Sequence, residues 1–158
     1  MQIRELERND VEPIRNILKA TNVFRDEEIE IAVELMEATL GKTEDYIQKA
    51  IADDAGSVQG YYCVGPTPMT ESTFDLYWIA VNPVFHGKGI GYRLLHDCER
   101  TVCLLNGTLI VVETSSTAKY EPTRKFYLRN NYLEAARIRD YYAPGDDLMI
   151  YTKNVQEH

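Results

Sequence analysis

Three alternate glycines, set between a β-branched strand and a long amphipathic helix, constrain the fold of this chain more than any other feature. The glycines are Gly87, Gly89 and Gly91, in a loop that follows the apolar run ending at Val81. Apolar residues then recur at helical spacing over 91–105. The first turn of a helix has N–H groups without intrahelical partners, and glycines let a ligand approach the backbone closely. The pattern therefore predicts a strand–loop–helix unit that binds an anion.

The spacing of these glycines argues against two familiar nucleotide motifs. A Walker loop needs Ser or Thr after Gly-Lys, but Gly89 follows Lys88. A dinucleotide fingerprint needs a third glycine one residue later than Gly91, and it would follow an early strand. A glycine turn that merely enters a helix is the remaining alternative. It is disfavoured by a local basic cluster made of His86, Lys88, Arg93, His96 and Arg100.

Length and charge limit the class of protein further. The chain has 158 residues, enough for one domain, and we expect a single domain over 1–158. Its formal net charge is −8, which disfavours a general nucleic-acid binder. No apolar run is long enough for a membrane helix and no leader is recognisable, so we expect a cytoplasmic protein without a membrane partner. Three sparse cysteines (Cys63, Cys98 and Cys103) are expected to be reduced thiols rather than a zinc site.

Periodicity predicts alternating helices and strands and therefore a mixed sheet with helices on both faces. Strands are predicted over 2–8, 57–64, 73–81, 108–112, 133–141 and 148–155. Helices are predicted from about Asn9, over 26–40, over 43–51 as a shorter helix, over 91–105 and over 122–129.

Three segments together resemble the GNAT superfamily of N-acetyltransferases. His86-x-x-Gly89-x-Gly91 resembles its Gln/Arg-x-x-Gly-x-Gly/Ala signature, residues 76–83 resemble its fourth strand, and 126–132 resemble its Phe-Tyr-x-x-x-Gly-Phe segment. The resemblance implies an α/β fold of the α+β type, with a mixed, mostly antiparallel sheet, helices on both faces, and splayed fourth and fifth strands. Two residues depart from the pattern: His86 replaces Gln or Arg, and Asn131 replaces Gly but tolerates the same left-handed backbone.

The same resemblance implies acetyl-CoA as co-substrate and no metal. The pantetheine arm would pair with the backbone of Ile79, Ala80 and Val81, and an N–H near Val81 would stabilise the oxyanion. The diphosphate would bind the amides of residues 87–91. The implied loop contacts to the cofactor are His86, Gly87, Lys88, Gly89, Ile90, Gly91 and Tyr92.

Two catalytic roles follow from the resemblance. Tyr127 would be the general acid that protonates the departing thiolate. An alkyl ammonium with a pKa of about 10.4 must lose a proton before it attacks, which calls for a base. Glu113, at the end of an apolar strand, is the candidate base, with Asp75 and Tyr77 as rivals. A Glu113 held by hydrogen bonds to neighbouring hydroxyls is an equal alternative.

Acceptor specificity would come from two loops. One contains Phe24 and Arg25. The other contains Tyr141 and Tyr142 beside Asp146 and Asp147, which together could receive a cation, although a plain surface turn explains this second loop better. The expected function is transfer of acetyl from acetyl-CoA to a primary amine by direct attack in a ternary complex. The expected acceptor is a small molecule or peptide, and the net charge of −8 favours a cationic one. The alternatives are a non-catalytic acyl-CoA sensor or interaction module, and a transferase for a longer acyl group. A homodimer is left open.

Overall fold

The chain forms two units, which the computed structural model describes over residues 1–156. The first unit contains Met1–Pro66 and Leu76–Glu99, and the second contains Thr67–Asp75 and the chain from Arg100 onward. Residues 157–158 of the expected domain lie outside the described part. The hydrogen-bonded strand order is β1-β2-β3-β4-β5-β7-β6, and β4 contributes residues to both units. Over residues 1–156, no helix has the length and apolar character needed to cross a membrane.

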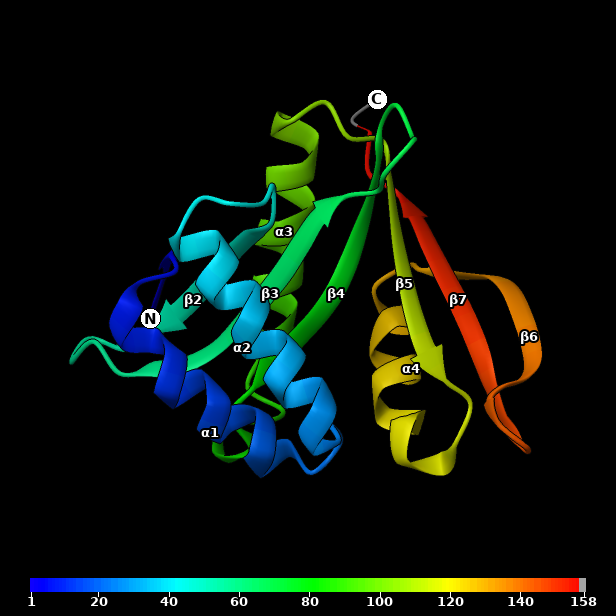
Figure 1. Ribbon diagram of the computed structural model, residues 1–158, viewed down its shortest axis with the longest axis horizontal. Coiled ribbons are helices and arrows are strands. Elements are labelled where there is room, and N and C mark those ends of the chain that lie inside the picture. Colours follow the sequence, from blue (N-terminus) through cyan, green and yellow to red (C-terminus); the bar gives the residue numbers. More distant parts are fainter. Residues whose placement is uncertain (157–158) are drawn as a thin grey trace. The chain divides into compact units, whose positions relative to one another are not determined.

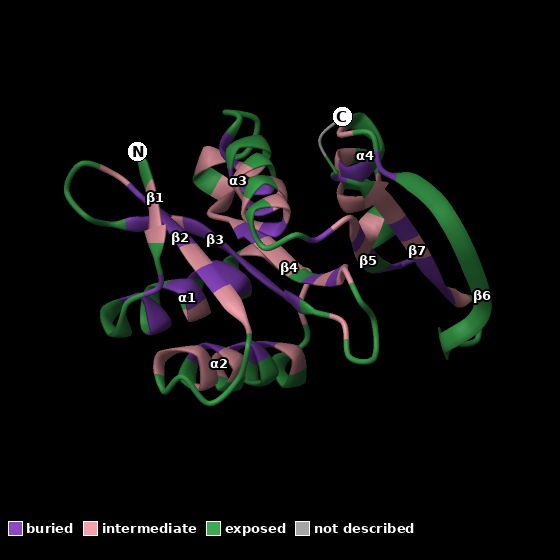
Figure 2. Ribbon diagram, turned by 90° about the horizontal axis from the view of Figure 1, so that it is seen from above, coloured by how far each residue is buried: buried purple, intermediate pink, exposed green. Residues whose placement is uncertain are grey.

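The first unit carries α1 and α2 on one face of its strands and α3 on the other (Figures 1 and 2). Its elements are β1 (Gln2–Glu5), α1 (Val11–Thr21), α2 (Asp26–Leu40), β2 (Ile47–Ala52), β3 (Val58–Pro66), the later part of β4 (Thr73–Val81) and most of α3 (Ile90–Leu104). Neighbours β1, β2 and β3 pair antiparallel. The apolar stripes predicted for the first two helices form the core, where Ile14, Leu18, Ile29 and Met36 are buried.

One predicted element is wrong, because the short helix expected over 43–51 is the strand β2. Ile47 pairs with Val64 and Ala50 pairs with Tyr61, so residues 47–52 lie beside β3. Gln48 is fully buried, and its Nε2 donates to the Leu35 carbonyl oxygen at 2.8 Å and to Thr39 Oγ1 at 2.8 Å. Strand pairing and these tertiary hydrogen bonds outweigh the helical preference of Gln, Lys and Ala.

The second unit is an antiparallel set of strands joined to the start of β4, with α4 beside them (Figure 1). Its elements are β5 (Leu109–Ser115), α4 (Glu121–Arg129), β6 (Leu133–Ala143) and β7 (Asp146–Asn154), and three short 3₁₀ turns occur in the whole described chain (Arg8–Asp10, Pro83–Phe85, Ala118–Tyr120). β7 pairs antiparallel with both β5 and β6. Residues 73–75 of β4 pair parallel with residues 109–111 of β5, and the register covers these three pairs only. The predicted fold class is confirmed: the sheet is mixed and mostly antiparallel.

Candidate active site

The glycine loop of the first unit has a backbone that only glycine adopts easily. Gly87 has φ +77° and Gly89 has φ +80°, and a Cβ placed on either residue would meet no atom within 4 Å. The glycines therefore serve the backbone conformation and leave the outer side of the loop open. A ligand can approach this part of the main chain without displacing a side chain.

Polar contacts hold the start of this loop to β3 and β4. The Asn82 N–H donates to the Gln59 carbonyl at 2.8 Å, and Asn82 Nδ2 donates to Gln59 Oε1 at 2.9 Å. His86 Nε2 lies 2.9 Å from the Val81 carbonyl oxygen, which can only accept, so the imidazole donates from this nitrogen. His86, predicted as a direct cofactor contact, thus also fastens the loop to the strand end.

The N-terminus of α3 offers a row of unpartnered amides. Arg93 donates its N–H to the Gly89 carbonyl at 3.1 Å, which is the first hydrogen bond of the helical ladder. Within residues 1–156, the N–H groups of residues 87–92 meet no acceptor. They lie at the positive end of a 15-residue helix, which favours a diphosphate there. The loop can therefore bind the anion that the sequence analysis predicted.

The side chains around these amides differ in the contacts that they can offer to a bound ligand. Ile90 is buried, so it can offer a ligand only its backbone. Lys88 is exposed, and its Nζ lies 5.5 Å from the centre of the Phe85 ring. Tyr92 is exposed and stacks on His96, with ring centres 6.0 Å apart. On β4, Ala80 is buried and its neighbours Ile79 and Val81 are half-buried.

Glu113, the candidate base, lies in the second unit beside another carboxylate. The parallel register pairs Asp75 with Val111, which places Asp75 and Glu113 on the same face of the sheet. Partial burial raises the pKa of Glu113, and the negative charge of Asp75 raises it further. In the described part of the chain Glu113 has no hydrogen bond or ion pair, so the alternative of a carboxylate held by Thr114, Ser115 or Ser116 is wrong.

Tyr142, predicted as an acceptor contact, is under the electrostatic influence of Glu113. Burial raises the pKa of Tyr142 to about 12, and the next contributions come from Glu113, Tyr141 and Tyr120. The Tyr141 ring contacts the Tyr142 ring edge-on, with centres 5.0 Å apart. The second unit thus contains one candidate base and two candidate acceptor residues, and the base affects the pKa of one of them. Tyr120 also affects the pKa of Tyr142, although no motif in the sequence indicated it.

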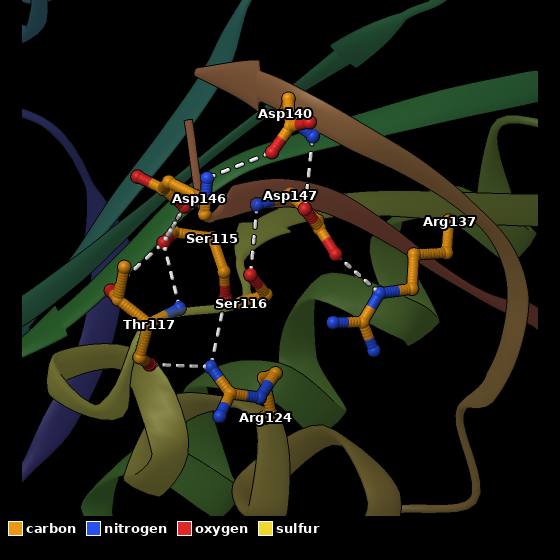
Figure 3. A network of polar contacts seen from close by, with 9 residues as sticks. Ser115, Ser116, Thr117, Arg124, Arg137, Asp140, Asp146 and Asp147 are labelled. Atoms are coloured by element: carbon orange, nitrogen blue, oxygen red, sulfur yellow. Dashed lines mark hydrogen bonds and ion pairs between the residues drawn. The ribbon is translucent and has the colours of Figure 1, made fainter. Parts of the chain in front are cut away.

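A polar network, drawn in Figure 3, fastens the β6–β7 turn to the end of β5 and to α4. Ser115 Oγ donates to Asp146 Oδ1, and Arg124 donates to the Ser115 carbonyl at 2.9 Å. Asp147 is buried; it accepts from Arg137 Nε at 2.6 Å and from the Asp140 N–H at 2.9 Å, which lowers its pKa. The two aspartates therefore hold the turn, in agreement with the alternative of a plain surface turn. The sequence analysis missed this network because its members are far apart along the chain.

Tyr127, the candidate general acid, is buried on α4 among aromatic rings of the second unit. Its ring centre lies 5.4 Å from that of Phe126 and 5.3 Å from that of Tyr132. The helix ends as predicted, because Asn131 has φ +68° and the Tyr132 N–H donates to the Tyr127 carbonyl at 3.0 Å. Asn131 therefore takes the left-handed position that glycine occupies in the family pattern.

The other acceptor candidates lie on the connection between α1 and α2. Phe24 contacts the Trp78 ring edge-on, with centres 6.2 Å apart. Arg25 Nε pairs with Glu28 Oε1 at 3.1 Å, so its guanidinium is partly engaged at the start of α2. Phe24 belongs to an aromatic group, whereas Arg25 supports a helix end.

Sequence and structure comparisons identify the family. The family model of the GNAT acetyltransferase domain matches residues 46–134. A protein from Desulfovibrio desulfuricans that is assigned to the GNAT family is 37% identical, has a TM-score of 0.92, and is aligned over 98% of both chains. No curated protein matches the sequence significantly. The chain belongs to the GNAT acetyltransferase family and is an N-acetyltransferase.

Two more distant structures share the fold and contain the cofactor. An aminoglycoside 6'-N-acetyltransferase complexed with coenzyme A is 19% identical, with a TM-score of 0.80, over 100% of this chain and 99% of that one. A Salmonella typhimurium protein assigned as an acetyltransferase, solved with acetyl-CoA, is 18% identical, with a TM-score of 0.78, over 100% of this chain and 95% of that one. At these identities the likeness concerns the fold alone.

Proposed function

We propose that this protein transfers the acetyl group of acetyl-CoA directly to a primary amine. The observation that carries the proposal is the row of unpartnered N–H groups over residues 87–92 at the start of α3. These amides would bind the diphosphate, with Lys88 and the helix dipole adding positive potential. The backbone of residues 79–81 would pair with the pantetheine arm. We further propose that both units work as one acetyltransferase domain, because the Desulfovibrio relative aligns over 98% of both chains.

The second unit would supply the proton chemistry. Glu113 accepts a proton from the substrate ammonium, directly or through water, and the free nitrogen attacks the thioester carbon. A backbone N–H near Val81 stabilises the oxyanion. When the carbon–sulfur bond breaks, Tyr127 gives its proton to the departing thiolate. The attacking nitrogen loses its second proton to water as the tetrahedral intermediate collapses. The products are an N-acetyl amide, coenzyme A and one proton released to solvent, and the proton taken up by Glu113 replaces the one that Tyr127 lost.

The cysteines support direct attack over an acetylated-enzyme intermediate. Burial raises the pKa of both Cys63 and Cys98, which keeps these thiols protonated and unreactive. Cys103 is half-buried, and its Sγ contacts the Val155 carbonyl oxygen. A thiol nucleophile needs the opposite environment, with access and a lowered pKa.

The test is a thiol-release assay on the purified protein with acetyl-CoA and a panel of amines. We expect amine-dependent release of coenzyme A, with the acetylated product identified by mass spectrometry. Tight binding of acetyl-CoA without release for any amine would contradict the proposal and favour a sensor or interaction module. Release with a longer acyl-CoA at a higher rate than with acetyl-CoA would favour the other alternative.

The pH dependence of kcat/KM should reveal the ionisation of Glu113. The base works only when ionised, so kcat/KM should fall as the pH falls through the raised pKa of Glu113. Asp75→Asn removes the neighbouring negative charge and lowers that pKa, so the acidic limb should move to lower pH. Glu113→Gln should abolish this limb and most of the activity.

Asp54→Asn is the control for Asp75→Asn. Asp54 is an exposed site in the first unit, so its substitution removes the same charge and should leave the acidic limb in place. An unmoved limb in Asp75→Asn would remove Glu113 as the base.

A further inference from the structure

A chain of side-chain hydrogen bonds runs from the β2–β3 turn to the loop that precedes α3, and no step of the proposed reaction uses it. We call it the polar chain and define it as Asp53, Gln59 and Asn82. Asp53 follows β2, Gln59 lies in β3 and Asn82 follows β4, all within the first unit. Gln59 Nε2 donates to Asp53 Oδ2 at 3.4 Å, and Asn82 Nδ2 donates to Gln59 Oε1 at 2.9 Å. The polar chain therefore joins the β2–β3 turn to the proposed diphosphate loop.

The Asp53 end of the polar chain is anchored to main-chain groups of its turn. Asp53 Oδ1 accepts from the Ala55 N–H at 3.0 Å and from the Ser57 N–H at 2.8 Å. The hydrogen bond from Ser57 does most to lower the pKa of Asp53, and the Gln59 amide also contributes. The carboxylate is therefore ionised at neutral pH, and its second oxygen can only accept from Gln59.

The Asn82 end of the polar chain is anchored to the start of the loop. Asn82 Oδ1 accepts from the Val84 N–H at 3.2 Å, and the Asn82 carbonyl oxygen accepts from the Phe85 N–H at 2.8 Å. Together these bonds hold the 3₁₀ turn Pro83–Phe85, which leads into the glycine loop. The position of Asn82 thus determines where the amides of residues 87–92 begin.

The two anchored ends determine the direction in which each amide faces. The Val84 N–H can only donate, so it takes the oxygen of the Asn82 amide and leaves Nδ2 for Gln59. The Asp53 carboxylate can only accept, so it takes the nitrogen of the Gln59 amide and leaves Oε1 for Asn82. Position 59 therefore needs one donor and one acceptor. The neutral amide of glutamine supplies both, whereas an ionised carboxylate supplies no donor.

We propose that Gln59 is a positioning residue for acetyl-CoA, because it fixes the Asn82 amide and thereby holds the diphosphate loop in its binding conformation. The inference rests on the proposed function and adds to it a residue of β3 that acts through Asn82 rather than on the coenzyme. A loop that is ordered before binding loses less conformational entropy when the ligand arrives. Loss of the polar chain should therefore weaken coenzyme A binding and leave the proposed proton chemistry of the second unit unchanged.

Two substitutions of Gln59 break the polar chain in different ways. Gln59→Ala removes both hydrogen bonds and should weaken coenzyme A binding about tenfold, the effect of losing about one neutral hydrogen bond. Gln59→Glu keeps the acceptor for Asn82, loses the donor and places a second negative charge beside Asp53. At neutral pH it should weaken binding by at least about tenfold. Isothermal titration with coenzyme A measures both changes.

A second substitution should restore the binding that Gln59→Glu loses. In the double variant Asp53→Asn/Gln59→Glu, the amide introduced at position 53 donates to the carboxylate introduced at position 59, which still accepts from Asn82. The net charge equals that of the wild type, and the Kd should return to within about threefold of the wild-type value. Asp53→Asn alone should weaken binding, because one amide oxygen cannot serve both the turn N–H groups and Gln59.

Steady-state kinetics distinguish positioning of the loop from a general loss of structure. In Gln59→Ala the KM for acetyl-CoA should rise, while kcat and the KM for the amine stay within about twofold of the wild type. Gln2→Glu is the matched control for Gln59→Glu, because Gln2 is exposed on β1 of the same unit. It should keep the wild-type Kd. Thermal unfolding shows whether each variant is folded at the temperature of the titration.

The outcomes distinguish this inference from the proposed function. A wild-type Kd in Gln59→Ala and Gln59→Glu would overturn the inference and leave the proposed function intact. A double variant that binds no more tightly than Gln59→Glu, or a kcat that falls as much as the KM for acetyl-CoA rises, would do the same. If the wild-type protein itself bound no coenzyme A, the proposed function would fail together with the inference.

Discussion

Tyr127→Phe should lower kcat about 100-fold, the lower end of what a well-placed general acid contributes. The substitution removes one oxygen and keeps the ring that packs on Phe126 and Tyr132, so the helix and the aromatic contacts should survive. Acetyl-CoA affinity should change little, because the proposed binding groups are amides of the first unit. Steady-state kinetics with one amine, together with equilibrium binding of coenzyme A, measure the two quantities separately.

Tyr132→Phe is the matched control for this variant. Tyr132 is a buried tyrosine of the same second unit, its ring centre is 5.3 Å from that of Tyr127, and its substitution removes the same atom. We expect its kcat to remain within about threefold of the wild type, because the Tyr132 hydroxyl takes part in no step of the proposed reaction. Wild-type turnover in Tyr127→Phe, or an equal loss in both variants, would mean that the Tyr127 hydroxyl is not the acid.

Local sequence patterns correctly predicted the helices and strands with strong periodicity. They failed where tertiary contacts determine the secondary structure. The α1, α2 and α3 stripes have clear helical spacing, and the glycines mark the entry to α3. The segment 43–51 contains good helix formers, yet it is a strand because Gln48 binds α2 and its neighbours pair with β3. These partners are on α2 and β3, so the pattern of residues within 43–51 does not reveal them.

The candidate site was predictable to the extent that it is built from backbone. Glycine spacing and the start of a helix locate the amides that we propose to bind the diphosphate, without any knowledge of distant residues. The environment of Glu113 depends instead on Asp75 and Tyr142, which come from other strands. The aspartates of the β6–β7 turn were compatible with a cation site or with a plain surface turn, and the contacts that hold the turn come from Ser115 and Arg137. The roles of these carboxylates depend on the pairing of strands that are far apart in the sequence.

Gly89→Asp should weaken acetyl-CoA binding by about 100-fold. An L-residue at φ +80° costs about 1–2 kcal/mol, which favours a loop conformation with misdirected amides. The carboxylate also repels the diphosphate by about 1 kcal/mol or more at close range, and each 1.4 kcal/mol is a factor of ten in Kd. Isothermal titration with coenzyme A measures the loss directly.

Two comparisons isolate the cause of that loss. Gly89→Asn has the same shape without the charge, so it should retain part of the affinity, and its difference from Gly89→Asp should shrink as salt screens the charge. Gly56→Asp has φ +88°, equally open surroundings and the same added charge, but lies in the β2–β3 turn. It should lose similar stability on thermal unfolding and keep the wild-type Kd. If Gly89→Asp binds coenzyme A no more weakly than Gly56→Asp does, the diphosphate does not bind at the start of α3, and the proposed alignment of acetyl-CoA along β4 fails with it.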